Sequence, residues 1–226
     1  MFWKNDEGGV QTAVLGLLEN TFLRDTKYKL ESVVEAKLVE TRGKMKLKAN
    51  QMAVPFTVHD ISGTPISLAD YQGKKLLLSF YRYAACPFCN LRVHHLIEHY
   101  DNLQARGLNV LAFFQSPQAK ILQYVTAKHD VPFPIVADPD HEVYKMYGLG
   151  ASWWGYIRGA MKMGLLREAS GIGLMENDPD GIKNLLPADF LIEPDQTIHT
   201  AFYGNDISEH IPFEQIDAFL EHKVAA

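Results

Sequence analysis

The chain has 226 residues, of which 47% are hydrophobic and 22% charged. This length and composition suit one sizeable domain with appendages, and they exclude a disordered or collagen-like chain. Lysine and arginine number 22 against 27 aspartate and glutamate, a net charge of −5, so we expect no binding to nucleic acid. The sequence has no run of 18 or more apolar residues and predicts no membrane span.

The start of the chain carries no targeting pattern. Residues 1–7 lack a basic stretch followed by an apolar one, and no small-residue cleavage site follows. We therefore expect no signal peptide and a cytoplasmic location. Because structural disulfides are rare in a reducing cytosol, two cysteines three positions apart favour redox or metal chemistry.

Apolar residues recur at helical spacing between residues 10 and 42, which predicts one or two amphipathic helices. We interpret them as a docking appendage; an arm for homodimerisation is the alternative, since an apolar stripe needs a partner. The lysine-rich residues 43–50 predict an exposed linker. The expected domains are thus a helical extension with its linker at 1–50 and a second domain at 51–226.

From residue 53 onward, runs typical of strands and helices alternate. The order strand, helix, strand, helix predicts a parallel βαβ unit and an α/β fold. Near the end, turn residues between two apolar runs predict a hairpin, which would make the sheet mixed. The expected elements are a hairpin within 53–68, strands at 76–81, 108–114 and 133–138, helices at 91–105, 117–129 and 141–147, a helical insertion within 151–184, a hairpin of 190–192 and 197–203, and a helix at 213–222.

The two cysteines lie where a buried strand gives way to a helix. Cys86 falls in the expected N-cap region and Pro87 at the first helical position, where its missing N–H costs nothing. The helix dipole stabilises an anion there, so Cys86 should ionise below the pH of a free thiol. Cys89 follows one turn later on the same face and should be less exposed. The pattern predicts Cys86 as the attacking thiolate and Cys89 as the resolving thiol.

A metal site at these thiols and a purely structural role for them are the alternatives. His94, His95 and His99 are close in sequence. His94 and His95 point to different faces of a helix, however, so at most one of them would join the thiols. We therefore expect no metal and no other cofactor.

Six segments carry a family likeness: Ala53–Val58, Gly63, Leu68, Gly73–Tyr81, Cys86-Pro87-Phe88-Cys89 and Leu186–Asp195. Through these residues the chain, over about 50–222, resembles the alkyl hydroperoxide reductase and thiol-specific antioxidant branch of the thioredoxin superfamily, in its peroxiredoxin-like, or redoxin-domain, group. The resemblance implies a thioredoxin-like fold with a helical N-terminal extension and a helical insertion. It also implies an oxidoreductase whose substrate is a peroxide or a disulfide and whose reductant is a dithiol such as thioredoxin, or glutathione.

Within the last of these segments, Pro187 matches the position at which the superfamily carries a cis-proline beside the active cysteine. The resemblance implies that Pro187 and Pro87 shape the substrate groove. Typical peroxiredoxins also carry a proline seven residues and a threonine three residues before the reactive cysteine. Here Ser79 and Tyr83 occupy those positions, and the Tyr83 hydroxyl is a candidate hydrogen-bond donor.

The family's arginine near the cis-proline is absent from this sequence. Arg82 and Arg92 are the nearest cations in sequence. We favour Arg82 as the substitute, because the end of the strand places it beside the thiol; a solvent-facing role for it is the alternative.

The insertion at 151–184 is rich in aromatic and methionine residues. It is predicted to cover the thiols or a partner; contact with a membrane is the least favoured use. Trp153 and Trp154 are candidates for an apolar substrate pocket, although core positions are the favoured interpretation. The preferred function is peroxide reduction. Thiol–disulfide exchange is the first alternative, and a non-catalytic or metal-handling module is the second.

Overall fold

The computed structural model describes residues 45–176 and 178–222. The chain divides into two units, Met1–Arg42 and Gly43–Ala226. The predicted N-terminal helices lie outside the described residues, so the expected domain boundary near residue 50 stays a prediction. In the described part, no helix is long and apolar enough to cross a membrane.

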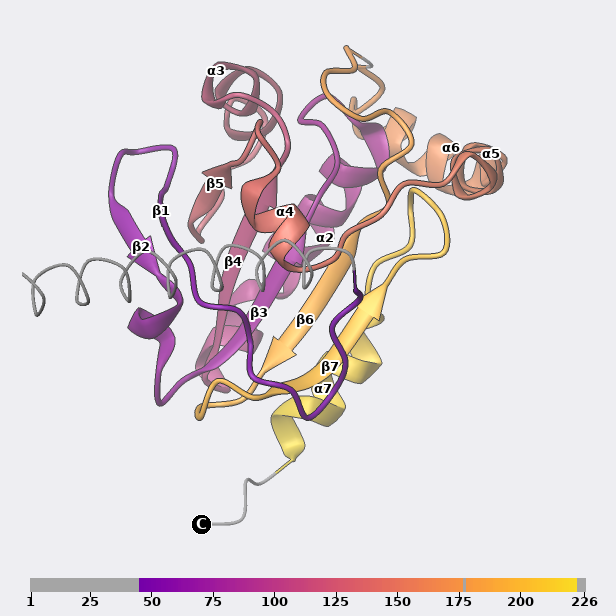
Figure 1. Ribbon diagram of the computed structural model, residues 1–226. Coiled ribbons are helices and arrows are strands. Elements are labelled where there is room, and N and C mark those ends of the chain that lie inside the picture. Colours follow the sequence, from indigo (N-terminus) through magenta and orange to yellow (C-terminus); the bar gives the residue numbers. More distant parts are fainter. Residues whose placement is uncertain (1–44, 177, 223–226) are drawn as a thin grey trace, which may run out of the picture. The chain divides into compact units, whose positions relative to one another are not determined.

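A five-stranded mixed sheet forms the centre of the second unit, in the order β5-β4-β3-β6-β7 (Figure 1). As predicted, the strand before the cysteines pairs in parallel with the next strand along the chain. The two C-terminal strands add to it antiparallel, as a hairpin. The five strands of this sheet are β3 Lys75–Phe80, β4 Leu108–Phe114, β5 Ile135–Ala137, β6 Ala188–Ile192 and β7 Ile198–Tyr203.

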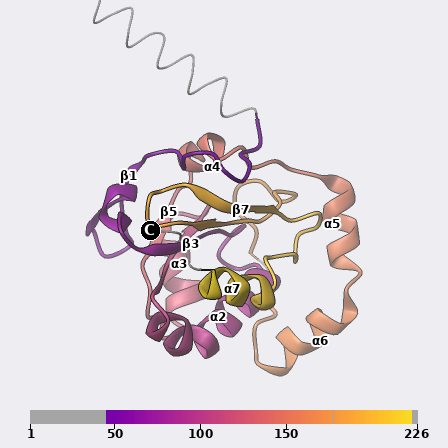
Figure 2. The ribbon, with the colours of Figure 1, turned by 90° about the horizontal axis from the view of Figure 1, so that it is seen from below.

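Separate apolar cores cover the two faces of this sheet. Alternate residues of β3 face opposite sides, so Leu77 and Tyr81 join the core under one set of helices, while Leu76 and Phe80 join the other core. Figure 2 shows α2 and α7 on one side of the sheet and α4 on the other. The helices are α2 Pro87–Ala105, α3 Gln118–Ile121 with a π turn at Leu122–Thr126, α4 Glu142–Met146 and α7 Phe213–Glu221.

The remaining N-terminal elements form a small hairpin, as the turn residues predicted. Strands β1 (Thr57–His59) and β2 (Pro65–Ser67) pair antiparallel, and a 3-10 turn follows at Leu68–Tyr71. The reactive helix is longer than its periodicity predicted, because Pro87 starts it directly after Cys86. This start makes Cys86 the N-cap residue and places Cys89 in the first turn of the helix.

The insertion folds into two short helices, α5 (Trp153–Ala160) and α6 (Met163–Gly171). Two glycines of α5 are buried against the loop after β7: a Cβ added at Gly155 would lie 2.7 Å from the Asn205 carbonyl oxygen, and one at Gly159 would overlap Ile207. These glycines therefore permit a close approach that no other residue allows. Helix α6 packs against α2 around Leu91 and Ala169.

Candidate active site

Both cysteines lie at the start of α2, at the carboxyl end of β3. Cys86 is the N-cap residue and Pro87 is in the first turn, which confirms the predicted placement. The expected difference in exposure is wrong, because the side chains of Cys86 and Cys89 are both fully buried. They carry free thiols in this structure.

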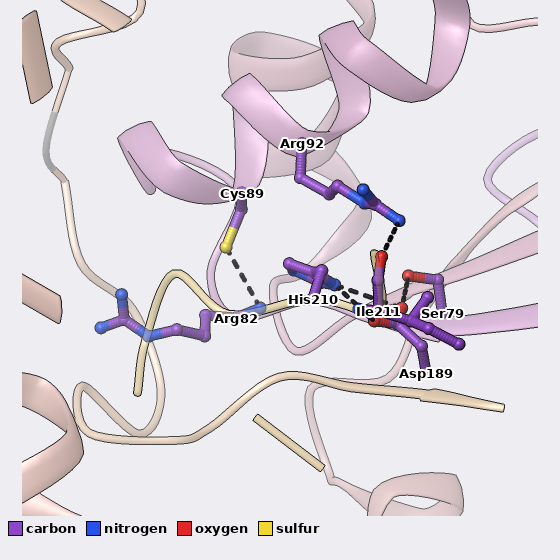
Figure 3. Close-up of polar contacts among 7 residues, drawn as sticks. All are labelled: Ser79, Arg82, Cys89, Arg92, Asp189, His210 and Ile211. Atoms are coloured by element: carbon purple, nitrogen blue, oxygen red, sulfur yellow. Dashed lines mark hydrogen bonds and ion pairs between the residues drawn. The ribbon is translucent and has the colours of Figure 1, made fainter. Parts of the chain in front are cut away.

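Arg82 is the cation that lies beside the thiols. Its Nη1 donates to the Cys86 sulfur at 3.2 Å, and its backbone N–H donates to the Cys89 sulfur at 3.4 Å; Figure 3 shows the second contact. The side chain is only 1% exposed, which rules out the solvent-facing alternative. A buried guanidinium is stable only near negative charge, so its surroundings favour an ionised thiol.

The surroundings of the two sulfurs give them different pKa values. Burial alone would raise the pKa of Cys86, but a hydrogen bond from the Cys89 thiol, the charge of Arg82 and the N–H groups of Cys89 and Phe88 lower it to about 6. Burial, and then the hydrogen bond to Cys86 and its charge, raise the pKa of Cys89 well above its ordinary value. At neutral pH the pair thus holds one thiolate, on Cys86, and one thiol.

This difference predicts a pH dependence for the reactive thiol. Since only the thiolate is a nucleophile, the rate of reaction with a peroxide should fall as the pH drops through the Cys86 pKa of about 6. The rate constant for loss of the first thiol, measured from about pH 4 to 8, gives this profile. A midpoint near the ordinary value for cysteine would contradict the proposed role of Arg82 and the helix terminus.

Two polar side chains that the sequence did not single out fix the loop before the thiols. Asn90 Nδ2 donates to the carbonyl oxygens of Ala84 and Cys86, at 2.6 and 3.1 Å. Ser116 Oγ accepts from the backbone N–H of Ala84 at 2.7 Å. The nearness of Ser116 to the thiols could have been predicted from the topology. Ser116 follows β4 as the thiols follow β3, and parallel strands end at the same edge of the sheet.

The end of the insertion contacts residues of the loops beside the thiols. Arg82 Nη2 donates to the Lys183 carbonyl oxygen. The Gln115 side chain donates to the Ile182 carbonyl at 3.1 Å and accepts from the Ile182 N–H at 2.9 Å, and Ser116 donates to Asp180 at 2.7 Å. The segment 178–187 is thus held by polar contacts to the loops that follow β3 and β4; that the insertion covers the thiols stays a prediction.

Aromatic rings surround Arg82, but they are not the predicted tryptophans. Its guanidinium lies 4.9 Å from the Tyr83 ring centre and 5.7 Å from that of Tyr156. Trp153 and Trp154 are 64% and 78% exposed, so their expected positions in the core are wrong. The reason is that α5 packs through its glycine face, which turns both tryptophans outward. Trp153 reaches the site only indirectly, through an edge contact with Tyr156.

The cis-proline expectation is also wrong for this structure. No peptide bond among the described residues is cis, so Leu186–Pro187 is trans. Pro187 is buried, and its carbonyl accepts from the Gly204 N–H at 2.9 Å, which ties the start of β6 to the end of β7. A buried proline does not line an open groove, so its role here is to join these strands. Pro87 is likewise buried in the first turn of α2.

The second arginine contacts a backbone carbonyl rather than a sulfur and lies beside a buried polar network (Figure 3). Arg92 Nη2 donates to the Ile211 carbonyl at 2.8 Å. Next to it, Asp189 on β6 accepts from Ser79 Oγ at 2.5 Å and from the Ile211 N–H at 2.7 Å, and pairs with His210 Nδ1 at 3.0 Å. Ser79 therefore joins β3 to β6 and the loop before α7 rather than contacting a substrate.

This network predicts a large loss of stability in Asp189→Asn. Burial would raise the pKa of Asp189, but the charge of His210, the hydrogen bond from His210, Arg92 and Ser79 lower it. The carboxylate therefore stabilises the fold at neutral pH. This contribution is lost when the pH falls through the lowered pKa. Breaking a buried pair on one side costs about 3–5 kcal/mol, which urea unfolding would measure. Asp178→Asn, which removes an exposed pair with Lys120, should cost far less; equal losses would contradict this account.

A cavity of about 270 Å³ opens beside the start of α2. It lies between α2, α6 and the loop before α7, and Arg92 and His210 contribute polar groups to an otherwise mostly apolar wall. Phe88, between the two cysteines in sequence, forms part of the lining. The cavity is thus adjacent to the thiol-bearing turn.

Comparison with known proteins agrees with this arrangement. The family model described as "AhpC/TSA family" matches residues 49–201. The peroxiredoxin Bcp of Escherichia coli is 29% identical over 164 residues, which cover 73% of this chain and 90% of that protein. The thiol-disulfide oxidoreductase ResA of Halalkalibacterium halodurans is 28% identical over 102 residues, 45% of this chain and 57% of that protein.

Among solved structures, the peroxidoxin BcpB of Mycobacterium tuberculosis superposes with a TM-score of 0.56 at 15% identity, over 77% of this chain and 96% of that one. At this identity the likeness supports the thioredoxin-like fold alone. The match of the family model extends over more than half of the chain and includes both cysteines. The chain therefore belongs to the AhpC/TSA family, as a peroxiredoxin-like thiol oxidoreductase.

Proposed function

We propose that this protein reduces peroxides, with Cys86 as the attacking thiolate and Cys89 as the resolving thiol. The observation that carries the proposal is the contact of the Arg82 guanidinium with the Cys86 sulfur at 3.2 Å in a fully buried site. A thiolate that is stable at neutral pH is the first requirement of peroxide reduction.

In the first step the Cys86 sulfur attacks one peroxide oxygen and the O–O bond breaks. A sulfenic acid forms on Cys86, and the other oxygen leaves as an alcohol, or as water from hydrogen peroxide, after taking up a proton. The Cys89 thiol then attacks the sulfenic sulfur, water leaves and a disulfide forms. Two electrons from a dithiol such as thioredoxin, or from glutathione, restore both thiols.

We assign Arg82 and the neighbouring Tyr83 as the groups that donate to the peroxide oxygens. Arg82 Nε is buried and has no hydrogen-bond partner among the described residues, an arrangement that marks a place for an acceptor. Burial and the charge of Cys86 raise the pKa of Tyr83, which keeps its hydroxyl protonated. Charge that develops on the leaving oxygen would thus meet a cation and a neutral donor.

Because both sulfurs are buried, the substrate reaches Cys86 only after a local opening. Segment 178–187 is the element that must move, since side-chain contacts through Gln115 and Ser116 hold it. A small peroxide requires less opening than a protein disulfide. The proposed site of action is the cytoplasm, where thioredoxin and glutathione are kept reduced.

Thiol–disulfide exchange is the second candidate function. The specific observation in its favour is the C-x-x-C pair within one helical turn, together with the cavity lined by Phe88, which offers an apolar surface to a larger substrate. In that reaction the Cys86 thiolate attacks a disulfide sulfur, and Cys89 then displaces the reduced product.

Two assays on the same preparation separate these functions. Consumption of hydrogen peroxide and of an organic hydroperoxide is followed with excess dithiol, and insulin reduction is followed in parallel. We expect catalytic consumption of peroxide well above that of the dithiol alone. Rapid insulin reduction without catalysed peroxide consumption would overturn the peroxidase proposal in favour of disulfide exchange.

A further inference from the structure

Three potential metal ligands meet at the end of the sheet opposite the thiols. Glu193 directly follows β6, His199 is in β7 and His222 is the C-cap residue of α7. One ligand atom from each lies within 4.8 Å of the other two. The end of α7 lies at the opposite end of the sheet from α5 and α6 (Figure 1), so this cluster is separate from the thiol chemistry.

Glu193 has an unexplained buried oxygen in this cluster. The residue is only 8% exposed, and its Oε2 has no hydrogen-bond partner among the described residues. Its other oxygen, Oε1, lies 3.6 Å from His222 Nδ1. A buried carboxylate oxygen without a partner is costly, and a bound cation would satisfy it.

The histidines are arranged so that a metal could use them. His199 Nδ1 is engaged with the Thr200 hydroxyl at 2.9 Å, which leaves Nε2 as the free ring nitrogen and orients the ring, as outer partners do for metal-bound histidines. The His199 ring also packs against Phe219 and His222, with ring centres 5.0 and 5.3 Å apart. His222 is 55% exposed in its side chain and is therefore free to close onto an ion.

Lys75 is a cation beside this cluster, but its N–H groups donate to backbone carbonyls. Its Nζ donates to the carbonyl oxygens of Phe219 at 2.6 Å and of His222 at 2.8 Å. These bonds hold the end of α7 against β3. The Glu193 carboxylate forms no ion pair with Lys75 among the described contacts, so its charge remains available to a metal.

We propose that Glu193, His199 and His222 bind a zinc-type divalent ion, with water as the fourth ligand. Two imidazoles and one carboxylate are a donor set that Zn²⁺ accepts in tetrahedral geometry. Ligand bonds of about 2 Å require separations of about 3.4 Å between ligand atoms, so the three side chains close inward on binding. The ion would join the ends of β6, β7 and α7.

Zinc titration of the full-length, untagged protein tests this site. The Cys86→Ser/Cys89→Ser background removes the thiols as competing ligands. All nine histidines lie within the described residues, so residues 1–44 add no imidazole. We expect one zinc per chain, and a tetrahedral absorption spectrum when Co²⁺ replaces it. Glu193→Gln and His199→Asn should each weaken binding at least about tenfold.

The matched control is His95→Asn. His95 also lies 2.8 Å from a glutamate, Glu168, but no third ligand joins that pair among the described residues. Its zinc affinity should equal that of the background protein. No zinc binding in the background, or binding that Glu193→Gln and His199→Asn leave unchanged, would overturn the proposal. A thermal melt of each variant without metal shows whether it is folded.

Discussion

Replacement of Cys86 by serine is expected to reduce peroxide turnover at least about a thousandfold, because it removes the nucleophile itself. The hydroxyl that takes its place has no thiolate character, so neither Arg82 nor the helix terminus can activate it at neutral pH. Insulin reduction should be lost in parallel, since both reactions begin at this sulfur. Steady-state peroxide consumption with excess dithiol measures the effect.

Cys89→Ser is the matched variant, because it removes the other buried sulfur of the same helical turn. It should consume about one equivalent of peroxide at a rate close to that of the parent protein. Later turnovers then depend on external thiol to resolve Cys86. If Cys89→Ser lost the first turnover and Cys86→Ser retained it, the assigned roles of the two cysteines would be reversed.

The second large effect is expected in Arg82→Met. Loss of the guanidinium removes the charge that lowers the Cys86 pKa, so that pKa should rise from about 6 toward the ordinary value for cysteine. It also removes a donor to the reacting oxygens, and a preorganised donor contributes about 10²–10³ in rate. We therefore expect a hundredfold or greater loss at pH 7, measured as the rate constant for peroxide.

Arg92→Met is the matched control, since each arginine donates to a backbone carbonyl and lies over an aromatic ring: Arg82 over Tyr83 and Arg92 over Phe213. Its loss should affect stability but leave the Cys86 pKa near 6. Arg82→Lys keeps the charge without the second donor arm and should retain part of the pKa shift. Equal pH profiles for Arg82→Met and Arg92→Met would contradict the role given to Arg82.

Much of the fold is predictable from local pattern. The apolar run that became β3 is hydrophobic on both faces, which is typical of a strand buried within a sheet, and Pro87 marks the helix start because proline is tolerated there. The placement of Arg82 follows from the same argument. It is the second residue after β3, in the turn that leads to the thiols, so its nearness to Cys86 needs little tertiary information.

The remaining features depend on contacts between distant segments. Segment 178–187 contacts Gln115 and Ser116 beside the thiols, and these contacts bridge more than 60 positions. Trp153 and Trp154 are outside because glycines on the opposite face of α5 approach the loop after β7. The spacing of residues predicts which of them share a helix face, but it does not predict which face packs against the rest of the domain. In α5 the packed face carries the small residues rather than the large ones.

Glu193, His199 and His222 illustrate the same limit. They are separated by 6 and 23 positions in the sequence, without the short spacing that marks most metal sites. Only the antiparallel return of β7 and the packing of α7 bring them together. His94, His95 and His99 are more closely spaced and lie near the thiols in sequence, yet they do not converge on the sulfurs.

The oxidation state of Cys86 after exposure to one equivalent of peroxide is the most direct test of the proposed mechanism. In Cys89→Ser, where no resolving thiol is present, mass spectrometry of the digested protein should find one oxygen atom added at Cys86, reversible by dithiol. Cys86→Ser should show none. An unmodified Cys86 in Cys89→Ser, with the peroxide not consumed, would contradict the assignment of Cys86 as the peroxide-reactive thiolate.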